Sequence, residues 1–199
     1  GTGGLGAPWR TGRSMPLLNG HTDRNFWKAG HPGTLLTSLI YFDFCFAVWV
    51  INGSMAPFIS EHFNLSPAET GVMLSVPVFA GSFLRVPLGL LAQYIGRKNT
   101  AQVNMGIVVV GLVLSFVLVD SLPGVILMGG LLGVAGASFG VALSLGSGWY
   151  PPRYKGLAMG IAGAGNSGAV LATLFAPPLA KAYGWQLVYE FAVIPMIIA

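Results

Sequence analysis

Charged residues are scarce in this sequence: 8% of its 199 residues are Asp, Glu, Lys or Arg, whereas 54% are hydrophobic. Soluble domains carry about 25% charged residues, because their surfaces face water. The scarcity therefore excludes an ordinary soluble fold. The charges that are present lie between apolar runs of about twenty residues, long enough to cross a hydrocarbon core of about 30 Å. Membrane-spanning helices are the predicted structure.

Cysteine is nearly absent as well, because Cys45 is the only one, so the sequence excludes an internal disulfide. The histidines His21, His31 and His62 lack the spacing of metal ligands. The sequence therefore predicts no catalytic residues, no metal site and no cofactor. The net charge is +4, but the cations lie beside apolar runs instead of forming one patch, which argues against nucleic acid as a partner.

Six apolar runs predict an all-α membrane protein with six transmembrane helices, over residues 34–59, 71–95, 100–119, 123–148, 157–180 and 186–199. The sixth run has 14 residues, fewer than the roughly 20 that a crossing needs. Since the sequence also begins with Gly1, we expect a fragment. The expected domains are a cytoplasmic tail over residues 1–33 and a six-helix half-domain over residues 34–199, with the sixth helix truncated.

The loop charges predict the orientation, because Lys and Arg are retained on the cytoplasmic side of a membrane. Eight of the ten cations fall on one side: Arg10, Arg13, Arg24, Lys28, Arg97, Lys98, Arg153 and Lys155. The opposite connections carry Glu61, Glu69 and Asp120, with Lys181 as their cation. We therefore expect a multi-pass protein of the inner (plasma) membrane with its N-terminus in the cytoplasm.

Two charged residues lie inside apolar runs. Arg85 lies ten residues from the cytoplasmic end of the second run. A charge there costs several kcal/mol unless it is paired or lines a wet cavity. It is either neutralised by a neighbouring helix or is an anion site, since the planar donors of a guanidinium match an oxyanion. Asp43 lies at a similar depth of about 15 Å in the first run. Three roles stay open for Asp43: an ion pair with Arg85, a proton-coupling carboxylate, or a residue facing the bundle interior.

The fifth run is rich in glycine. Gly163, Gly165 and Gly168 match the pattern GxGxxG, but a dinucleotide site is excluded because no strand precedes them. Small residues recur every four positions in this run and in the fourth, which predicts two smooth ridges along which these helices approach each other. The ridges consist of Gly156, Gly160, Ala164, Gly168 and Ala172, and of Gly136, Gly140, Ser144 and Gly148.

Asn166 is not explained by packing, because its amide must hydrogen-bond within the bundle or to a ligand. Asn166 and Phe139 fall at the depth of Arg85 and Asp43. Four helices are thus predicted to place these residues in one layer near the membrane midplane, where transporter sites usually lie.

Three segments carry a family resemblance. GLLAQYIGRK is similar to the loop between helices two and three of the major facilitator superfamily, with Gln93 where an Asp is usual. SFLRVPLG is similar to the segment with the substrate arginine of the nitrate/nitrite porters, and AGAGNSG to their glycine-rich signature in helix five. Residues 34–199 therefore resemble the N-terminal half of a twelve-helix porter of this family, which has a 3+3 inverted repeat.

The resemblance implies roles for single residues. Arg85 would hold the anion, Phe139 would help to sandwich it, and Asn166 with Gly163, Gly165 and Gly168 would contact it or make room for it. FDFCFAVWV is similar to the branch that imports nitrate with protons, which makes Asp43 the candidate for proton coupling.

The expected function is secondary active transport of nitrate and/or nitrite by alternating access, through proton symport or nitrate/nitrite exchange. The expected partners are the anion, protons, the lipid bilayer and the C-terminal half. Three alternatives remain: a facilitator for another small anion such as a carboxylate or phosphate, an anion channel, and a membrane sensor. A sensor would need a soluble output domain, for which a tail of 33 residues is too small.

Overall fold

The computed structural model describes residues 25–198, which form helices and no strands. The elements are η1 (Phe26–Lys28), α1 (Pro32–His62), α2 (Pro67–Tyr94), α3 (Arg97–Leu118), α4 (Leu122–Gly136), α5 (Ser138–Ser147), α6 (Pro152–Gly163), η2 (Ala164–Ser167), α7 (Gly168–Tyr183), α8 (Trp185–Phe191) and α9 (Val193–Ile198). Helices satisfy all backbone hydrogen bonds within one segment, as a chain in lipid requires.

Five helical segments of the described part are long and apolar enough to cross a membrane: Pro32–His62, Pro67–Tyr94, Arg97–Leu118, Leu122–Ser147 and Pro152–Tyr183. The shorter apolar stretch Trp185–Ile198 follows them. The predicted all-helical membrane class is confirmed. The fifth segment begins at Pro152 instead of residue 157, because proline fits the first turn of a helix, where its missing N–H is not needed.

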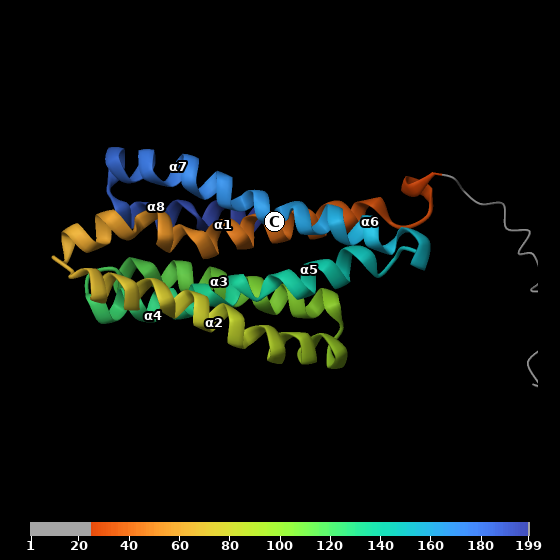
Figure 1. Ribbon diagram of the computed structural model, residues 1–199, viewed down its shortest axis with the longest axis horizontal. Helices are drawn as coiled ribbons and strands as arrows, with labels where there is room; N and C mark the ends of the chain where they lie inside the picture. The colour runs from red at the N-terminus through yellow and green to blue at the C-terminus, as the bar shows by residue number, and fades with distance from the viewer. Residues whose placement is uncertain (1–24, 199) are drawn as a thin grey trace, which may run out of the picture.

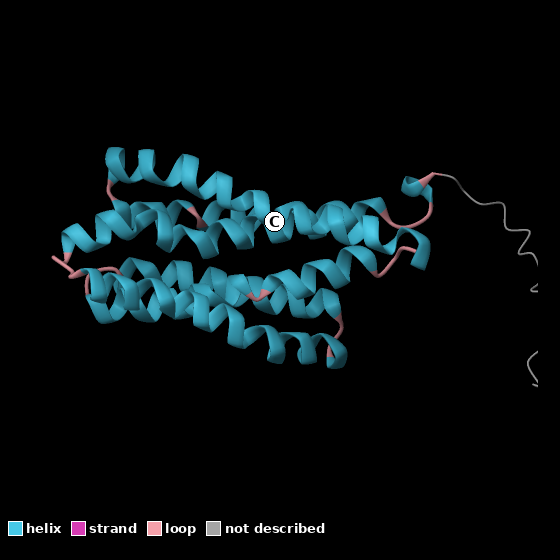
Figure 2. Ribbon diagram, viewed as in Figure 1, coloured by secondary structure: helices cyan, strands magenta, loops and turns pink. Residues whose placement is uncertain are grey.

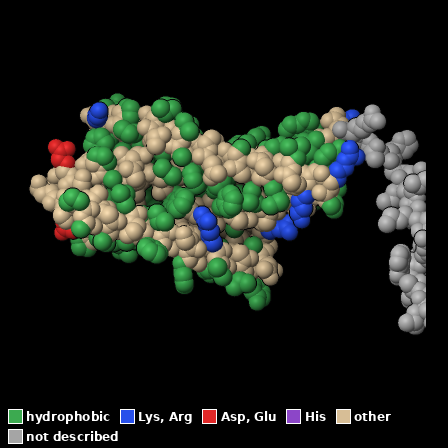
Figure 3. All heavy atoms as spheres, viewed as in Figure 1, with side chains coloured by type: hydrophobic (Ala, Val, Ile, Leu, Met, Phe, Trp, Pro, Cys, Tyr) green, Lys and Arg blue, Asp and Glu red, His purple; other side chains and the backbone are tan. Residues whose placement is uncertain are grey.

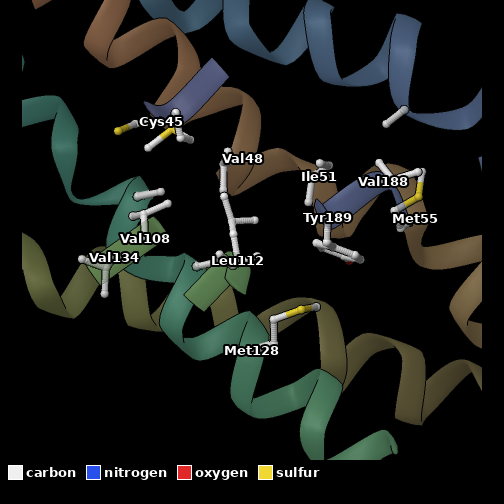
Figure 4. Close-up of a cluster of buried hydrophobic side chains, with 14 of the residues drawn as sticks. Cys45, Val48, Ile51, Met55, Val108, Leu112, Met128, Val134, Val188 and Tyr189 are labelled. Atoms are coloured by element: carbon white, nitrogen blue, oxygen red, sulfur yellow. The ribbon is translucent and has the colours of Figure 1, made fainter. Parts of the chain in front are cut away.

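The helices lie side by side in two groups (Figure 1). α1, α7 and α8 run along one side of the view, and α2, α3 and α4 along the other. The closest packing pairs α2 with α4, α1 with α7, and α3 with α4. The groups meet in an apolar core to which α1, α3, α4 and α8 all contribute (Figure 4). Its members include Cys45, Val48, Ile51, Met55, Val108, Leu112, Met128, Val134, Val188 and Tyr189.

Short connections keep consecutive helices antiparallel. Gly96 ends the turn between α2 and α3 with φ of 85°, and Gly184 ends the turn between α7 and α8 with φ of 94°. Only glycine adopts such angles at little cost, so each turn reverses the chain within one or two residues. At the other end of α2, Ser66 and Glu69 form a capping box that satisfies the first backbone N–H groups.

Two of the spanning segments are interrupted near their middle. Ala137 separates α4 from α5, and the gap is drawn as a loop in Figure 2. Val134 O there accepts hydrogen bonds from Ala137 N, at 3.0 Å, and from Asn104 Nδ2, at 2.9 Å. The fifth segment narrows to the 3-10 turn Ala164–Ser167 between α6 and α7. Irregular backbone at this depth is tolerated in membrane proteins where protein surrounds it or where it lines a cavity.

Charge separates the two ends of the bundle (Figure 3). Arg97, Lys98, Arg153 and Lys155 lie in the first turns of α3 and α6, at what we call the cation-rich end. Glu61, Glu69 and Asp120 lie at the opposite end, together with Lys181 in the last turn of α7. The predicted cations Arg10, Arg13 and Arg24 fall outside the described residues.

Candidate functional site

Arg85 lies on α2 beside the interruption between α4 and α5. Its Nε donates a long hydrogen bond of 3.4 Å to Gly136 O. Its Cζ lies 5.8 Å from the centre of the Phe139 ring, within the range of a cation–π contact. The sequence alone predicts that Arg85 and Phe139 share a layer, and the structure places them in contact.

Most N–H donors of the Arg85 guanidinium have no acceptor in the described part of the chain. It carries five N–H donors, of which Nε–H alone has a protein acceptor within the described part of the chain. The same part contains no carboxylate paired with Arg85, and the side chain is exposed. The Nη1 and Nη2 groups therefore present free, coplanar donors to a ligand with two acceptor oxygens.

Phe139 belongs to an aromatic cluster that extends across α1. The cluster consists of Phe42, Phe46, Trp49 and Phe139. The ring centres of Phe139 and Phe42 lie 5.3 Å apart, those of Phe42 and Phe46 5.4 Å, and those of Phe46 and Trp49 5.4 Å. Their planes are inclined by 55–63°, the edge-on geometry that aromatic pairs favour. The ring facing Arg85 is thus held by neighbours.

Trp49 occupies a slot between α2 and α4. A Cβ at Gly136 would lie 2.7 Å from Trp49 Nε1, and a Cβ at Gly81 would lie 3.2 Å from the same atom. Trp49 Nε1 donates a 3.1 Å hydrogen bond to Pro77 O. Trp49 was not singled out from the sequence, although phenylalanines precede it at three alternate positions of the first span, 42, 44 and 46.

Asp43 is not the partner of Arg85. Its Oδ1 accepts a hydrogen bond of 2.6 Å from Ser167 Oγ, and the described residues include no ion pair to this carboxylate. The ion pair with Arg85, one of the three roles left open for Asp43, is therefore not formed in the structure. Ser167 ends the 3-10 turn of the fifth segment, so Asp43 connects α1 to the glycine-rich signature.

Gly165 and Gly168 are buried against α1. A Cβ at Gly165 would lie 2.7 Å from Phe42 Cδ1 and 2.8 Å from Asp43 N, and a Cβ at Gly168 would overlap Asp43 O. Both glycines thus let the fifth segment approach the backbone of α1. Gly163 differs, because a Cβ there would only touch Leu143 of α5, at 3.4 Å.

The predicted contact between two ridges of small residues is wrong. Gly140, Gly156 and Gly160 have open space where a Cβ would be, and Gly136 faces Trp49. The spacing of four residues predicts one common helix face in the fifth run, but Gly168 and Ala172 are buried whereas Gly156, Gly160 and Ala164 are exposed. In the structure Gly168 meets α1 instead of the fourth span.

Asn166 lies in the 3-10 turn between Gly165 and Ser167. Its side chain is exposed, and the amide has no hydrogen-bond partner in the described part of the chain. Asn166 is thus linked to Arg85 through contacts: Gly165 against Phe42, Phe42 against Phe139, and Phe139 against Arg85. Arg85 and Phe139 lie on this contact path, and Asp43 and Asn166 each follow one of its members, Phe42 and Gly165, in the sequence.

Two further buried amides were missed by the sequence analysis. Asn52 accepts a 2.5 Å hydrogen bond from Tyr189 Oη, and Asn104 joins α3 to Val134 O. The sequence could have indicated them, because Asn52 and Asn104 are polar residues within apolar runs, as Asn166 is. Both form hydrogen bonds between helices within the protein, so they bind helices together. Within residues 25–198, no three His, Cys, Asp or Glu side chains cluster as metal ligands.

Comparison with known proteins yields one family and a set of relatives. Residues 37–199 match the Major Facilitator Superfamily. Proteins named "Probable nitrate transporter NarT" from the Staphylococcus aureus strains JH9, Newman and USA300 are each 34% identical over 142 residues. The aligned region covers 71% of this chain and 36% of each relative. The chain thus spans about a third of the length of these curated relatives.

Proposed function

Because the chain belongs to the Major Facilitator Superfamily, we propose that it is the N-terminal six-helix half of a secondary transporter for nitrate and/or nitrite. The earlier resemblance to nitrate/nitrite porters agrees with the name of the relatives. The transporter lies in the inner (plasma) membrane, with the cation-rich end and the N-terminus in the cytoplasm. It works by alternating access, with the anion bound between two six-helix halves.

The free donors of Arg85 are the observation that carries this proposal. An unpaired guanidinium deep in an apolar segment is costly, so it is retained where it binds a ligand or lines water. Nitrate and nitrite are planar oxyanions, and two of their oxygens match the parallel N–H groups of Nη1 and Nη2. Since Nε is already engaged by Gly136 O, the outer donors are the ones that receive the anion.

The neighbouring residues complete the anion site. Phe139 covers one face of it and orients the guanidinium, and the free amide of Asn166 supplies a further donor. The glycines contribute differently. Gly165 and Gly168 bring the segment that carries Asn166 against α1, and Gly163 leaves space beside α5.

Uptake of an anion requires an energy source. Moving one negative charge into a cell against about 100 mV costs about 2.3 kcal/mol. Proton symport or exchange of nitrate for nitrite supplies this energy. Asp43 is the candidate for proton coupling, because it is an acidic residue within the first span and is held beside the anion signature by Ser167.

The test is nitrate uptake by the full-length transporter in proteoliposomes, with Arg85→Lys as the variant. Lysine keeps the charge but loses the two parallel donors, so uptake should fall to background while the protein is still produced and folded. Arg153→Lys, in the first turn of α6 at the cation-rich end, serves as the control for an arginine-to-lysine change. Normal uptake by Arg85→Lys would contradict forked recognition at this residue.

Competition and rate measurements separate the remaining functions. If a carboxylate or phosphate competes with labelled substrate and nitrate does not, the protein is a facilitator for another anion. A flux that does not saturate and shows no exchange between the two sides would indicate an anion channel.

A further inference from the structure

A cavity of about 280 Å³ with both polar and apolar lining residues opens at the cation-rich end of the bundle. It lies between the start of α3, the last two turns of α5 and the first turns of α6, and Arg97, Ser147 and Lys155 contribute its polar groups. None of these three residues belongs to the proposed central site. The cavity is large enough for a small ion with several waters.

The electrostatic environment of this cavity is positive and uncompensated. Arg97 is the first residue of α3, and Lys155 lies in the first turn of α6. Neither helix has an acidic residue in its first turn or a side-chain cap. The N-terminal end of a helix is the positive end of its dipole, so the backbone adds to the charge of the two cations. No described carboxylate pairs with either of them.

Arg97 is held against the end of α5. A Cβ at Gly148 would overlap Arg97 Nη1, so the absence of a side chain there leaves room for the guanidinium. Arg97 consequently lines this cavity and also a neighbouring one that contains Lys98. Lys98 does not reach the cavity of Arg97, Ser147 and Lys155.

Ser147 supplies an independent sign of a ligand. Its side chain is 2% exposed, and its hydroxyl has no hydrogen-bond partner among residues 25–198. Ser144 lines the same cavity but donates a 2.9 Å hydrogen bond to Val141 O. Ser147 lines the cavity, so its hydroxyl is available to donate a hydrogen bond to an acceptor that enters there.

The cavity lies directly along the helix from the central site. Gly140 lines it, and the preceding residue, Phe139, contacts Arg85. Eight residues of helix separate Phe139 from Ser147, a rise of about 12 Å. Retention of cations on the cytoplasmic side explains why Arg97 and Lys155 are at this end, but it does not explain why both line one open cavity together with Ser147.

We propose that Arg97, Lys155 and Ser147 form a second oxyanion subsite, which receives the transported anion between Arg85 and the cytoplasm. The inference rests on the proposed function for the identity of the anion. Two cations attract the anion electrostatically, and the hydroxyl of Ser147 donates a hydrogen bond to it. The subsite shortens the distance that the anion crosses without a partner.

Direct binding tests the subsite without transport. In the full-length protein in neutral detergent, nitrate should raise the melting temperature above its value in chloride at equal ionic strength. Part of this rise should persist in Arg85→Gln and disappear in Arg85→Gln/Lys155→Gln and Arg85→Gln/Ser147→Ala. Arg85→Gln/Lys98→Gln and Arg85→Gln/Ser144→Ala are the matched controls, and both should keep it.

Transport from each side gives the second readout, with Arg85 intact. In counterflow from proteoliposomes, Lys155→Gln and Ser147→Ala should raise the half-saturating internal nitrate concentration roughly threefold to tenfold. The external value should not change. An equal effect of Lys98→Gln, or no effect of Lys155→Gln, would overturn the subsite.

The lipid composition separates a free anion from a lipid phosphate. The effect of Lys155→Gln should be the same in vesicles of phosphatidylcholine alone and in vesicles that also contain phosphatidylglycerol. An effect confined to the anionic vesicles would assign the cavity to a lipid headgroup and overturn the proposal. If nitrate protection depends on Lys155 while the unmodified protein moves no nitrate, the subsite stands and the proposed function fails.

Discussion

The hydroxyl of Ser167 donates a 2.6 Å hydrogen bond to Oδ1 of Asp43, joining the 3-10 turn of the fifth segment to the middle of α1. The carboxylate is therefore held in place by a neutral group instead of a cation. An acidic residue inside a membrane span is often functional, which supports the proposed role of Asp43 in coupling.

Asp43→Asn should uncouple transport without unfolding the protein. Asparagine retains an oxygen that accepts the hydrogen bond from Ser167, but its amide does not gain and lose a proton as a carboxylate does. Nitrate uptake driven by a pH gradient should be lost, whereas nitrate/nitrite exchange should persist, as measured with proteoliposomes. Ser167→Ala is the control: it removes the hydrogen bond but keeps the carboxylate, so proton-driven uptake should persist. Undiminished proton-driven uptake by Asp43→Asn would remove Asp43 from the mechanism.

Gly168→Ala and Gly160→Ala should have opposite effects on stability. A Cβ at Gly168 would overlap Asp43 O, so the substitution should cost about 1–3 kcal/mol by forcing the fifth segment away from α1. Gly160 has open space at the same position, and alanine favours a helix by roughly 1 kcal/mol over glycine. Thermal unfolding in detergent measures both. Equal melting temperatures for the two variants would contradict the backbone contact.

Phe139→Leu should weaken anion binding. The ring orients the guanidinium of Arg85 at 5.8 Å, and such contacts contribute about 0.5–2 kcal/mol. The KM for nitrate should therefore rise, with little change in the amount of folded protein. Phe116→Leu, at a side chain of α3 that is 57% exposed, is the control and should leave KM unchanged. An unaltered KM for Phe139→Leu would show that Arg85 needs no help from the ring.

Tyr189→Phe should destabilise the bundle. The hydroxyl of Tyr189 donates a 2.5 Å hydrogen bond to Asn52 Oδ1, and both side chains are buried. Its removal leaves a buried acceptor unsatisfied, at a cost of about 1–3 kcal/mol. Tyr183→Phe changes a side chain that is 62% exposed and should have little effect. Denaturant unfolding of the two variants in detergent compares them, and equal midpoints would contradict a structural role for the bond.

The spanning helices were predictable from the sequence because lipid imposes a simple rule: an apolar run of sufficient length forms a helix. Hydropathy does not show where such a helix is interrupted. Ala137 favours a helix, and small residues such as those of the turn Ala164–Ser167 are common in membrane helices, so neither position predicts an interruption by itself. The interruptions depend on tertiary contacts, such as the amide of Asn104 that shares Val134 O with Ala137 N.

The sequence proposes members for the candidate site but does not indicate their contacts. Arg85, Asp43 and Asn166 stand out in the sequence because polar groups are costly in lipid. Their depth along each helix follows from residue counting, but their rotation about the helix axis does not. The structure therefore pairs Asp43 with Ser167, which depth alone did not predict. The roles of Arg85, Asn166 and Asp43 in transport remain predictions.

The packing of α2 on α4 has a mechanical consequence for the anion. A Cβ at Gly81 would lie 2.9 Å from Gly133 O, so no side chain separates the two backbones four residues before Arg85. Sliding or tilting one helix against the other would break this close fit. Arg85 is thus fixed on a rigidly packed pair of helices. In the proposed alternating-access mechanism, the anion therefore changes sides through movement of the other half relative to this rigid pair of helices.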